Sequence, residues 1–576
     1  MKRIALSAAA LSVLMLAACA TTGAPSPAQD AGLRTSQVPE PVEGRSGYGL
    51  YLAGRAALAD GRSDMAAKYF ERAALAGAES ATLKERTFQS ALFAGDIPAA
   101  AANAPADGEG SIILVRLGQL TRGVEAIASG DGAAAKAILV DQGVGFPHRP
   151  AATLLAPWAA AAAGDMEAAT VRPVLRGDRL VEVFGLHGQA LLLERAKRYD
   201  EAEANYKQLM ALGDAAIIFA PDYGAFLERR RRGKEAVEVY DKALAVAPND
   251  VTLKQARERA ASRRKAPAMM SVREGSARAL LIPAASLAAE KQYGLALAYT
   301  RLALRLDPAR DDSWVLLGDI FSGMEDSENA REAYARIRPG SASYATARSK
   351  LAWTLQTSGD TAAALTMAED AVRASPEDRD ALVTYADILR ANERYAESAK
   401  VLDKVVAADG AGVDWRILFM RAVARDRSGD WPGAEADLLL ALQRQPDEPD
   451  LLNYLGYSWI DRGVRLGEAL PMVQKAVAAN PRNGAMIDSL GWAYFRMGDY
   501  RNAVEHLERA VLLEPADPEI NDHLGDAYWQ VGRQIEARFQ WTRVLQLDAP
   551  QDIRVRAEDK LKNGLTGVKP VVAERP

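Results

Sequence analysis

Apolar residues recur at spacings of three and four along most of the chain, which is the period of one face of an α-helix. In one well-kept stretch, Leu490 and Tyr494 lie one turn apart, and Ala503, Leu507 and Ala510 follow at intervals of four and three. Alternation of apolar and polar residues, the pattern of a half-buried strand, is nearly absent. The pattern therefore predicts an all-α protein with almost no sheet.

Glycine and proline mark the ends of these predicted helices. The pair Gly498-Asp499 predicts a turn, because glycine tolerates the left-handed backbone that ends a helix. Gly491 carries no side chain and lets the second helix pack close to the first. Pro515 ends the second helix, since proline disfavours helical geometry in the residue before it. The stretch is thus a helix–turn–helix unit.

The same unit returns further along the chain at a fixed interval. Residues 490–494 read LGWAY and residues 524–528 read LGDAY, and Ala503 and Ala537 repeat the spacing. Clear copies lie upstream around Gly318 and Gly456, and weaker ones around Gly54, Gly224, Leu351 and Ala434. The resulting 34-residue period is typical of the tetratricopeptide repeat (TPR), a unit that cannot bury its apolar face alone. We predict a TPR-type α-solenoid, a superhelix of roughly 13 to 15 units between residues 47 and 560.

The repeat register breaks in the middle of the chain. Pro248 and Pro308 both close second helices, but the interval between them falls short of two full repeats. A polar, basic helix at 251–264 and then Lys265-Ala266-Pro267 fill the interval. One interpretation is that two arrays join near residue 265. The other is a degenerate repeat inside one continuous superhelix.

The N-terminus reads as a lipoprotein leader. Basic Lys2-Arg3 precedes an apolar run of about a dozen residues, too short to span a bilayer, which ends in Leu16-Ala17-Ala18-Cys19. This resembles the bacterial lipobox, in which the cysteine receives diacylglycerol and the leader is cut before it. The alternative is a plain secretory signal that contains a cysteine. Ala20 follows, with no acidic residue there, and by resemblance to the sorting rule of enteric bacteria this favours the outer membrane, periplasmic face.

These observations divide the chain into five parts. The predicted parts are a signal peptide at 1–18, a lipidated flexible linker at 19–46, an N-terminal degenerate array at 47–264, a C-terminal array at 265–548, and a capping helix with a tail at 549–576.

Charge and chemistry narrow the function classes. The formal net charge is −5, which argues against nucleic acid, whose phosphates require a basic surface. The run Arg229–Arg232 ends a predicted helix before Gly233, and we interpret it as a solvated turn. The four histidines show no metal-ligand spacing, and no catalytic motif is present. We predict no enzyme activity, no metal and no cofactor.

The candidate site is the concave surface, which the first helix of each unit lines at places three and four residues apart. In the last three units these places include Asn453, Tyr457, Asp488, Trp492, Phe495, Asp522, Asp526 and Trp529. Aromatic rings mixed with carboxylates suit a protein partner with apolar and basic side chains. The alternative is that Trp492 and Trp529 pack between repeats.

The lipobox, the linker, the alanine-rich first units and the final block together resemble a known family. The block includes NYLGY at 453–457, DSLGW at 488–492 and HLG at 523–525. The family is that of proteobacterial outer-membrane TPR lipoproteins, which includes the adaptor of a periplasmic carboxyl-terminal processing protease. The resemblance implies a scaffold that presents substrates to such a protease. The second hypothesis is a scaffold in outer-membrane assembly or exopolysaccharide export.

Replacing Cys19 with serine tests the lipid anchor. Without the thiol no diacylglycerol can be attached, and we expect the variant to leave the membrane fraction, since the acyl chains supply the stable anchoring. Cell fractionation with immunodetection measures the outcome. A Cys19→Ser protein that stays in the outer membrane like the parent contradicts the lipoprotein interpretation.

Overall fold

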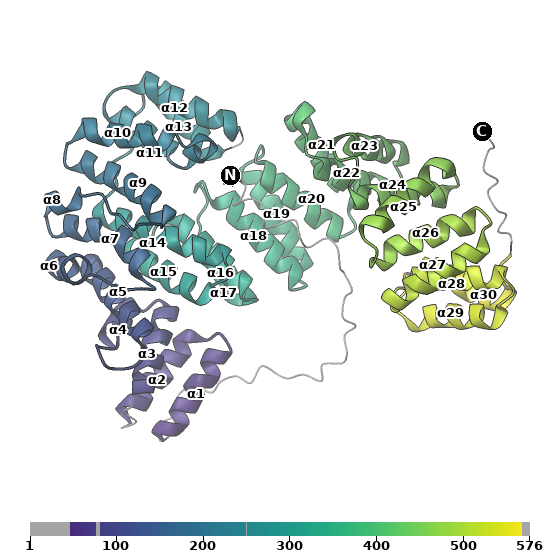
Figure 1. Ribbon diagram of the computed structural model, residues 1–576, viewed down its shortest axis with the longest axis horizontal. Coiled ribbons are helices and arrows are strands. Elements are labelled where there is room, and N and C mark those ends of the chain that lie inside the picture. Colours follow the sequence, from purple (N-terminus) through teal and green to yellow (C-terminus); the bar gives the residue numbers. More distant parts are fainter. Residues whose placement is uncertain (1–45, 77–80, 249, 567–576) are drawn as a thin grey trace. The chain divides into compact units, whose positions relative to one another are not determined.

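The computed structural model describes residues 46–76, 81–248 and 250–566, and every regular element in these ranges is helical (Figure 1). The all-α prediction is confirmed. The signal peptide, Cys19, nearly all of the predicted linker and the end of the tail lie outside the described residues. Two compact units make up the chain, the first ending at Ala381 and the second beginning at Leu382.

The first unit contains a series of helices joined by short turns. They are α1 (Gly47–Ala59), α2 (Ser63–Leu75), α3 (Ala81–Ala94), α4 (Ile97–Ala102), α5 (Ile112–Ser129), α6 (Gly132–Lys136), the π-helix η3 (Ala137–Gln142), α7 (Arg149–Ala162), α8 (Met166–Ala169), α9 (Arg179–Arg195), α10 (Tyr199–Met210), the 3₁₀-helix η4 (Gly213–Ile218), α11 (Ala220–Arg229), α12 (Gly233–Val246), α13 (Val251–Ala261), α14 (Val272–Ala289), α15 (Tyr293–Leu306), α16 (Asp311–Gly323), α17 (Ser327–Ala335), α18 (Tyr344–Thr357) and α19 (Thr361–Ala374).

The second unit is more regular. After α20 (Arg379–Ala391), which begins just before the boundary, it contains α21 (Tyr395–Asp409), the 3₁₀-helix η5 (Gly410–Gly412), α22 (Trp415–Arg427), α23 (Trp431–Arg444), α24 (Pro449–Arg462), α25 (Leu466–Ala479), α26 (Gly484–Arg496), α27 (Tyr500–Leu513), α28 (Pro518–Gln530), α29 (Gln534–Gln546) and α30 (Gln551–Asn563).

Consecutive helices pack as hairpins, and the described residues form fourteen such pairs, of which α20 and α21 are joined by a hydrogen bond from the Ser398 hydroxyl to the Ala386 carbonyl. Six pairs run from α1 to α12, three from α14 to α19 and five from α20 to α29. Helices α13 and α30 have no second helix of their own. The number of pairs agrees with the 13 to 15 units that the 34-residue period predicts.

A glycine on the first helix sets the spacing within a pair. A Cβ built on Gly491 would lie 2.6 Å from Cγ of Leu507, and one on Gly525 would lie 2.4 Å from Nε1 of Trp541. The same relation joins Gly54 with Phe70, Gly224 with Tyr240, Gly318 with Tyr334 and Gly456 with Val473. The large side chain of the second helix thus occupies the space of the missing one, as the sequence predicts for Gly491.

The predicted turn at Gly498-Asp499 is also confirmed. Gly498 has a φ of +82°, in the left-handed region that favours glycine. The Asp499 carboxylate then accepts a hydrogen bond from the Asn502 backbone N–H at 3.3 Å and caps α27.

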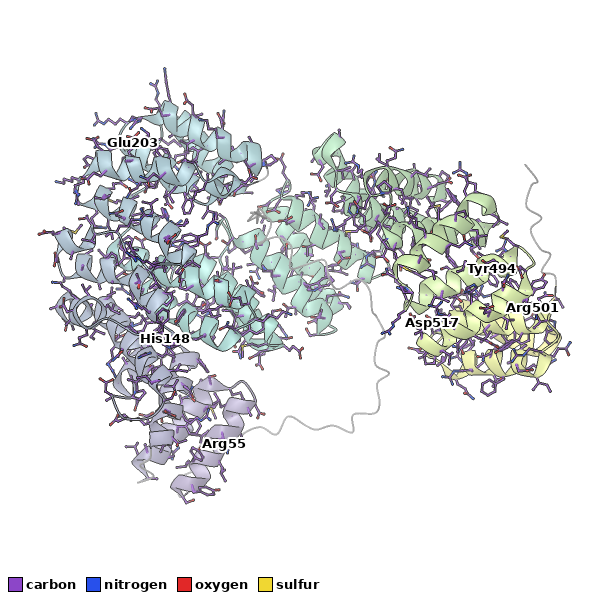
Figure 2. All side chains as sticks on the ribbon, in the orientation of Figure 1. Arg55, His148, Glu203, Tyr494, Arg501 and Asp517 are labelled. Carbon is purple, nitrogen blue, oxygen red and sulfur yellow. The ribbon has the colours of Figure 1, made fainter. Side chains whose placement is uncertain are left out.

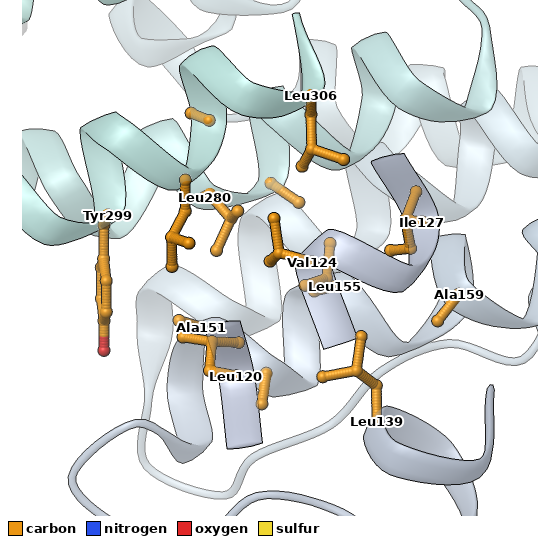
Figure 3. Close-up of a cluster of buried hydrophobic side chains, with 14 of the residues drawn as sticks. Leu120, Val124, Ile127, Leu139, Ala151, Leu155, Ala159, Leu280, Tyr299 and Leu306 are labelled. Atoms are coloured by element: carbon orange, nitrogen blue, oxygen red, sulfur yellow. The ribbon is translucent and has the colours of Figure 1, made fainter. Parts of the chain in front are cut away.

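In the first unit the chain packs back on itself after α13. Helix α14 contacts α7 and α9, and α15 contacts α3 and α5. Figure 3 shows the shared core, with Leu120 and Val124 of α5, Leu155 of α7, Leu280 of α14 and Tyr299 of α15. The domain boundary that the sequence predicts near residue 265 stays a prediction, and the structure shows that helices from both sides of it share one apolar core.

Polar contacts fix this packing. Nδ1 of His148 and the Tyr299 hydroxyl are hydrogen bonded at 2.7 Å, and burial lowers the pKa of His148 to about 4, so its ring is neutral. Arg305 of α15 binds the carboxylate of Glu125 on α5 through two hydrogen bonds of 2.8 Å. These contacts join segments that lie far apart in the sequence.

The arginine run lies where a helix ends, as predicted, but it is not simply solvated. Arg229 forms an ion pair at 2.7 Å with the buried carboxylate of Glu194. Arg232 pairs with Glu203 at 2.5 Å and with Glu235 at 2.6 Å. For these two arginines the expectation of a solvated turn is wrong, because carboxylates of neighbouring helices meet them.

The packing of Gly525 on Trp541 can be tested by adding one methyl group. We expect Gly525→Ala to destabilise the second unit by about 1 to 3 kcal/mol, the usual cost of overpacking. Gly467→Ala is the matched control, because a Cβ there meets nothing within 4 Å in helix α25. That variant should be neutral or stabilised by up to about 1 kcal/mol. Urea unfolding measures both, and equal stability of the two variants contradicts the packing argument.

Candidate partner-binding groove

The predicted groove residues lie on three neighbouring first helices, α24, α26 and α28, which contact one another in that order. Local sequence fixes where each helix begins. Asp517, labelled in Figure 2, caps α28 by accepting hydrogen bonds from the N–H groups of Glu519 and Ile520. Asn483 caps α26 through the N–H of Met486. The caps set the register that places residues of successive repeats side by side.

Asp488 and His523 form a buried pair between two repeats. Nδ1 of His523 lies 3.0 Å from both carboxylate oxygens of Asp488, and the two residues are 5% and 4% exposed. Burial alone lowers the pKa of His523, but the charge and hydrogen bond of Asp488 raise it to about 9. The imidazole is therefore charged at neutral pH, and its Nδ1–H donates a hydrogen bond to the carboxylate.

Trp492 is stacked between two rings. Its centroid lies 4.7 Å from that of Phe495 on the same helix and 4.0 Å from that of His523 on α28, with the planes within 11° of parallel. Phe495 is completely buried, whereas Trp492 is half-buried. The indole Nε1 of Trp492 is buried and has no hydrogen-bond partner among the described residues. The structure thus shows Trp492 packing between repeats.

Lys560 of α30 forms ion pairs with both of the other two acids, Asp522 and Asp526. Its Nζ lies 2.8 Å from both oxygens of Asp522 and 2.7 Å from Oδ1 of Asp526. Nε1 of Trp541 also donates to Asp526, at 3.0 Å. Burial raises the pKa of Asp526 to about 6, against the opposing effect of Lys560, and the nearby charge of Asp522 adds to the rise.

The remaining predicted residues differ in their surroundings. The Tyr457 hydroxyl donates to Glu519 of α28 at 2.8 Å, and burial together with this carboxylate raises the pKa of Tyr457. Asn453 is half-buried, and its Oδ1 has no partner among the described residues. Trp529 is half-buried and lies 5.4 Å from the ring of Trp541.

These contacts correct two expectations about the groove. Phe495 belongs to the core and offers no surface, because the rings of Trp492 and Tyr500 cover it. The acids Asp488, Asp522 and Asp526 are buried and paired within the chain, so they present no free negative charge to a partner. Asn453, Tyr457, Trp492 and Trp529 keep part of their surface exposed. A role of the eight residues in partner binding stays a prediction.

The structure adds two residues to the site that the sequence analysis did not include, His523 and Lys560. The 34-residue period contained a signal for Lys560, because it lies one repeat length after Asp526. His523 lies 35 residues after Asp488, one residue more than the repeat length. Periodicity predicts which residues share a helix face, but it does not predict which side chain of a neighbouring helix contacts that face.

The described residues give no sign of a metal centre. Within 46–76, 81–248 and 250–566, no group of three or more His, Cys, Asp or Glu side chains is placed to hold an ion. A search of the same residues for helices long and apolar enough to cross a membrane finds none.

Comparison with known families identifies the repeats. Tetratricopeptide repeat models match residues 311–337, 349–413 and 419–484, and a TPR repeat model matches residues 491–532. The predicted TPR-type α-solenoid is confirmed. The TPR repeat-containing protein PA4667 of Pseudomonas aeruginosa is 35% identical over 96 residues, which cover 17% of this chain and 16% of that protein.

Two further proteins are similar to this chain, one over a short segment and the other over most of its length. Cellulose synthase operon protein C of Escherichia coli is 38% identical over 82 residues, 14% of this chain and 7% of that protein. The match thus spans less than a fifth of either curated relative. The crystal structure of the APC/C hetero-tetramer Cut9-Hcn1 aligns with 90% of this chain and 96% of its own, with 15% identity and a TM-score of 0.38.

The His523–Asp488 pair predicts a pH-dependent stability. Folding raises the pKa of His523 from about 6.5 to about 9, so its contribution is complete below pH 6.5 and is lost as the pH rises through 9. We expect the unfolding free energy of the second unit to fall by up to about 3 kcal/mol between these limits. Asp526, with a pKa of about 6, titrates mostly below this window.

Urea titrations at fixed ionic strength measure this dependence. His523→Gln keeps a hydrogen-bond donor but cannot titrate, and its stability should change much less between pH 6.5 and 9.5. If the parent and His523→Gln show the same slope, the buried pair does not carry the linkage.

Proposed function

We propose that this protein is a non-catalytic, lipid-anchored adaptor that binds other proteins through its TPR solenoid on the periplasmic side of the outer membrane. The observation that carries the proposal is the run of tetratricopeptide repeats between residues 311 and 532. Stacked helix pairs of this kind present extended surfaces to protein partners. The proposed lipid anchor is supported by the lipobox-like sequence that ends at Cys19.

The proposed partners are a periplasmic carboxyl-terminal processing protease and its substrates. Support comes from the resemblance of the final block to the adaptor lipoproteins of such proteases. The match to PA4667 supports the repeat architecture alone.

A second candidate function is a scaffold for exopolysaccharide export or outer-membrane assembly. The similarity to cellulose synthase operon protein C favours it, since cellulose is an exopolysaccharide. The two functions differ in what binds the chain: a protease with its substrates, or the components of an export or assembly complex.

Affinity purification of the full chain from cross-linked membranes separates these candidates. Recovery of a processing protease together with its substrates supports the adaptor, and recovery of export or assembly components supports the alternative. If neither class is enriched over a strain without the tagged chain, both functions are wrong.

The recovered partner then tests the groove. We expect Trp492→Ala and Trp529→Ala to weaken binding by about 1 to 4 kcal/mol, the range of aromatic hot spots. Phe539→Ala is the matched control: it also removes an aromatic ring, but from the second helix α29, where the ring is 65% exposed. Thermal melts of each variant separate lost binding from lost folding. Tryptophan variants that melt and bind like the parent place the groove elsewhere.

A further inference from the structure

The first unit contains a cavity of about 380 Å³ beside α7, far along the chain from the predicted groove. Its volume falls within the range of ligand-binding pockets. The walls come from η3 and the loop that follows it, from α7, and from α8 and the segment after it. They include Val140, Arg149, Thr153, Ala156, Val171 and Arg172.

The cavity exists because the second helix of this repeat is short. Helix α8 has four residues, whereas α27, a regular second helix, has 14. Pro173 disfavours helical geometry at Arg172, and the Thr170 hydroxyl donates to the carbonyl of Met166 where α8 ends. The short α8 therefore leaves Thr153 and Ala156 of α7 half-buried at the cavity.

The part of α7 that lines the cavity is long enough to lie along a short helix of a partner. Its lining residues run from Arg149 to Ala160, about 16 Å along the axis at 1.5 Å per residue. The rim adds apolar surface, because Val171 is 64% exposed and Val174, three residues on, is 62% exposed. An occupant that covers both the cavity and its rim is a piece of a macromolecule rather than a small free molecule.

The charged side chains that line the cavity are all positive. Arg149 and Arg172 are its only charged lining residues, and neither has a carboxylate within ion-pair distance in the described part of the chain. Arg172 donates to the backbone carbonyl of Glu182 at 3.3 Å, and Arg149 lies over the ring of Phe146 at 5.6 Å. Two guanidinium groups without carboxylates beside apolar walls are complementary to an apolar surface that carries acidic groups.

We propose that this cavity binds a short amphipathic helix of a partner protein, which replaces the missing part of α8. Its apolar side chains lie against Thr153 and Ala156 of α7 and against Val171, and its Asp or Glu carboxylates pair with Arg149 and Arg172. This inference rests on the proposed protein-binding role but not on the C-terminal groove. It follows the helix-in-groove mode of recognition.

A designed peptide tests the site directly. The probe is a fluorescein-labelled 18-residue amphipathic helix with an Ala and Leu face flanked by glutamates, and the control peptide carries lysine in place of each glutamate. Fluorescence anisotropy with the full-length chain measures binding. We expect the glutamate peptide to bind at least 10-fold more tightly than the lysine peptide, and less tightly as salt increases.

Variants of the chain locate the binding. Arg149→Glu and Arg172→Glu should each weaken binding of the glutamate peptide at least 10-fold, and Thr153→Trp should abolish it by filling the cavity. Arg176→Glu is the matched control, an exposed arginine of the same connection that does not line the cavity. Thermal melts confirm that each variant is folded.

Several outcomes overturn the proposal. They are no binding of the glutamate peptide, equal binding of both peptides, equal effects of Arg172→Glu and Arg176→Glu, and binding of dodecanoate in place of the peptide, which would indicate a site for a small apolar anion. Trp492→Ala and Trp529→Ala should bind the peptide like the parent. The peptide assay and the purification of cellular partners can therefore fail independently.

Discussion

The regular repeats depend on the contact between a glycine of the first helix and a large side chain of the following helix, which six of the pairs show. Gly525 faces Trp541, and Gly318 faces Tyr334, at the same interval along the sequence in both pairs. Where the turn is longer by one residue, Gly456 faces Val473, and the interval grows to match. The contact brings the two helices of a pair together and buries the large ring or aliphatic group between them. Because it lies within one pair, it can repeat along the chain without long-range constraints.

The sequence predicts this contact and therefore the fold. Gly491, the turn at Gly498-Asp499 and the stripe from Ala503 to Ala510 are local features with local causes, and the structure shows all of them. The packing of α14 and α15 against α7 and α5 has no such signal. It depends on side chains such as His148 and Tyr299, which lie 151 residues apart and match no repeat register. Pairings of this kind follow from the whole fold and not from any one segment.

The candidate groove shows the same limit of sequence-based prediction, here for residues in neighbouring repeats. Helical periodicity predicts that Asp488, Asp522 and Asp526 share a face, and α26 and α28 do lie side by side. Periodicity does not predict the cations that meet them. His523 reaches Asp488 from the adjacent repeat, and Lys560 reaches Asp522 and Asp526 from α30. A buried carboxylate requires such a partner, because an unpaired charge away from water is costly. In the sequence this face looks like an acidic binding surface. In the structure its carboxylates are largely buried and form ion pairs between neighbouring helices at the end of the solenoid.

The irregular repeats carry information of a different kind. A regular repeat covers its own first helix, so its exposed surface comes only from positions that the stacking leaves free. The repeat of α7 and α8 departs from the pattern at Thr170 to Pro173, and the result is a cavity beside α7 with two arginines among its lining residues. The same departure makes this stretch fit the 34-residue period poorly. Loss of the repeat pattern here does not mean loss of structure, since α7 keeps Leu155 and Trp158 in the shared core with α14. In the degenerate repeat, one side of α7 is thus packed into the core through Leu155 and Trp158. Another side lines the cavity with the half-buried residues Thr153 and Ala156, where we propose the docking site.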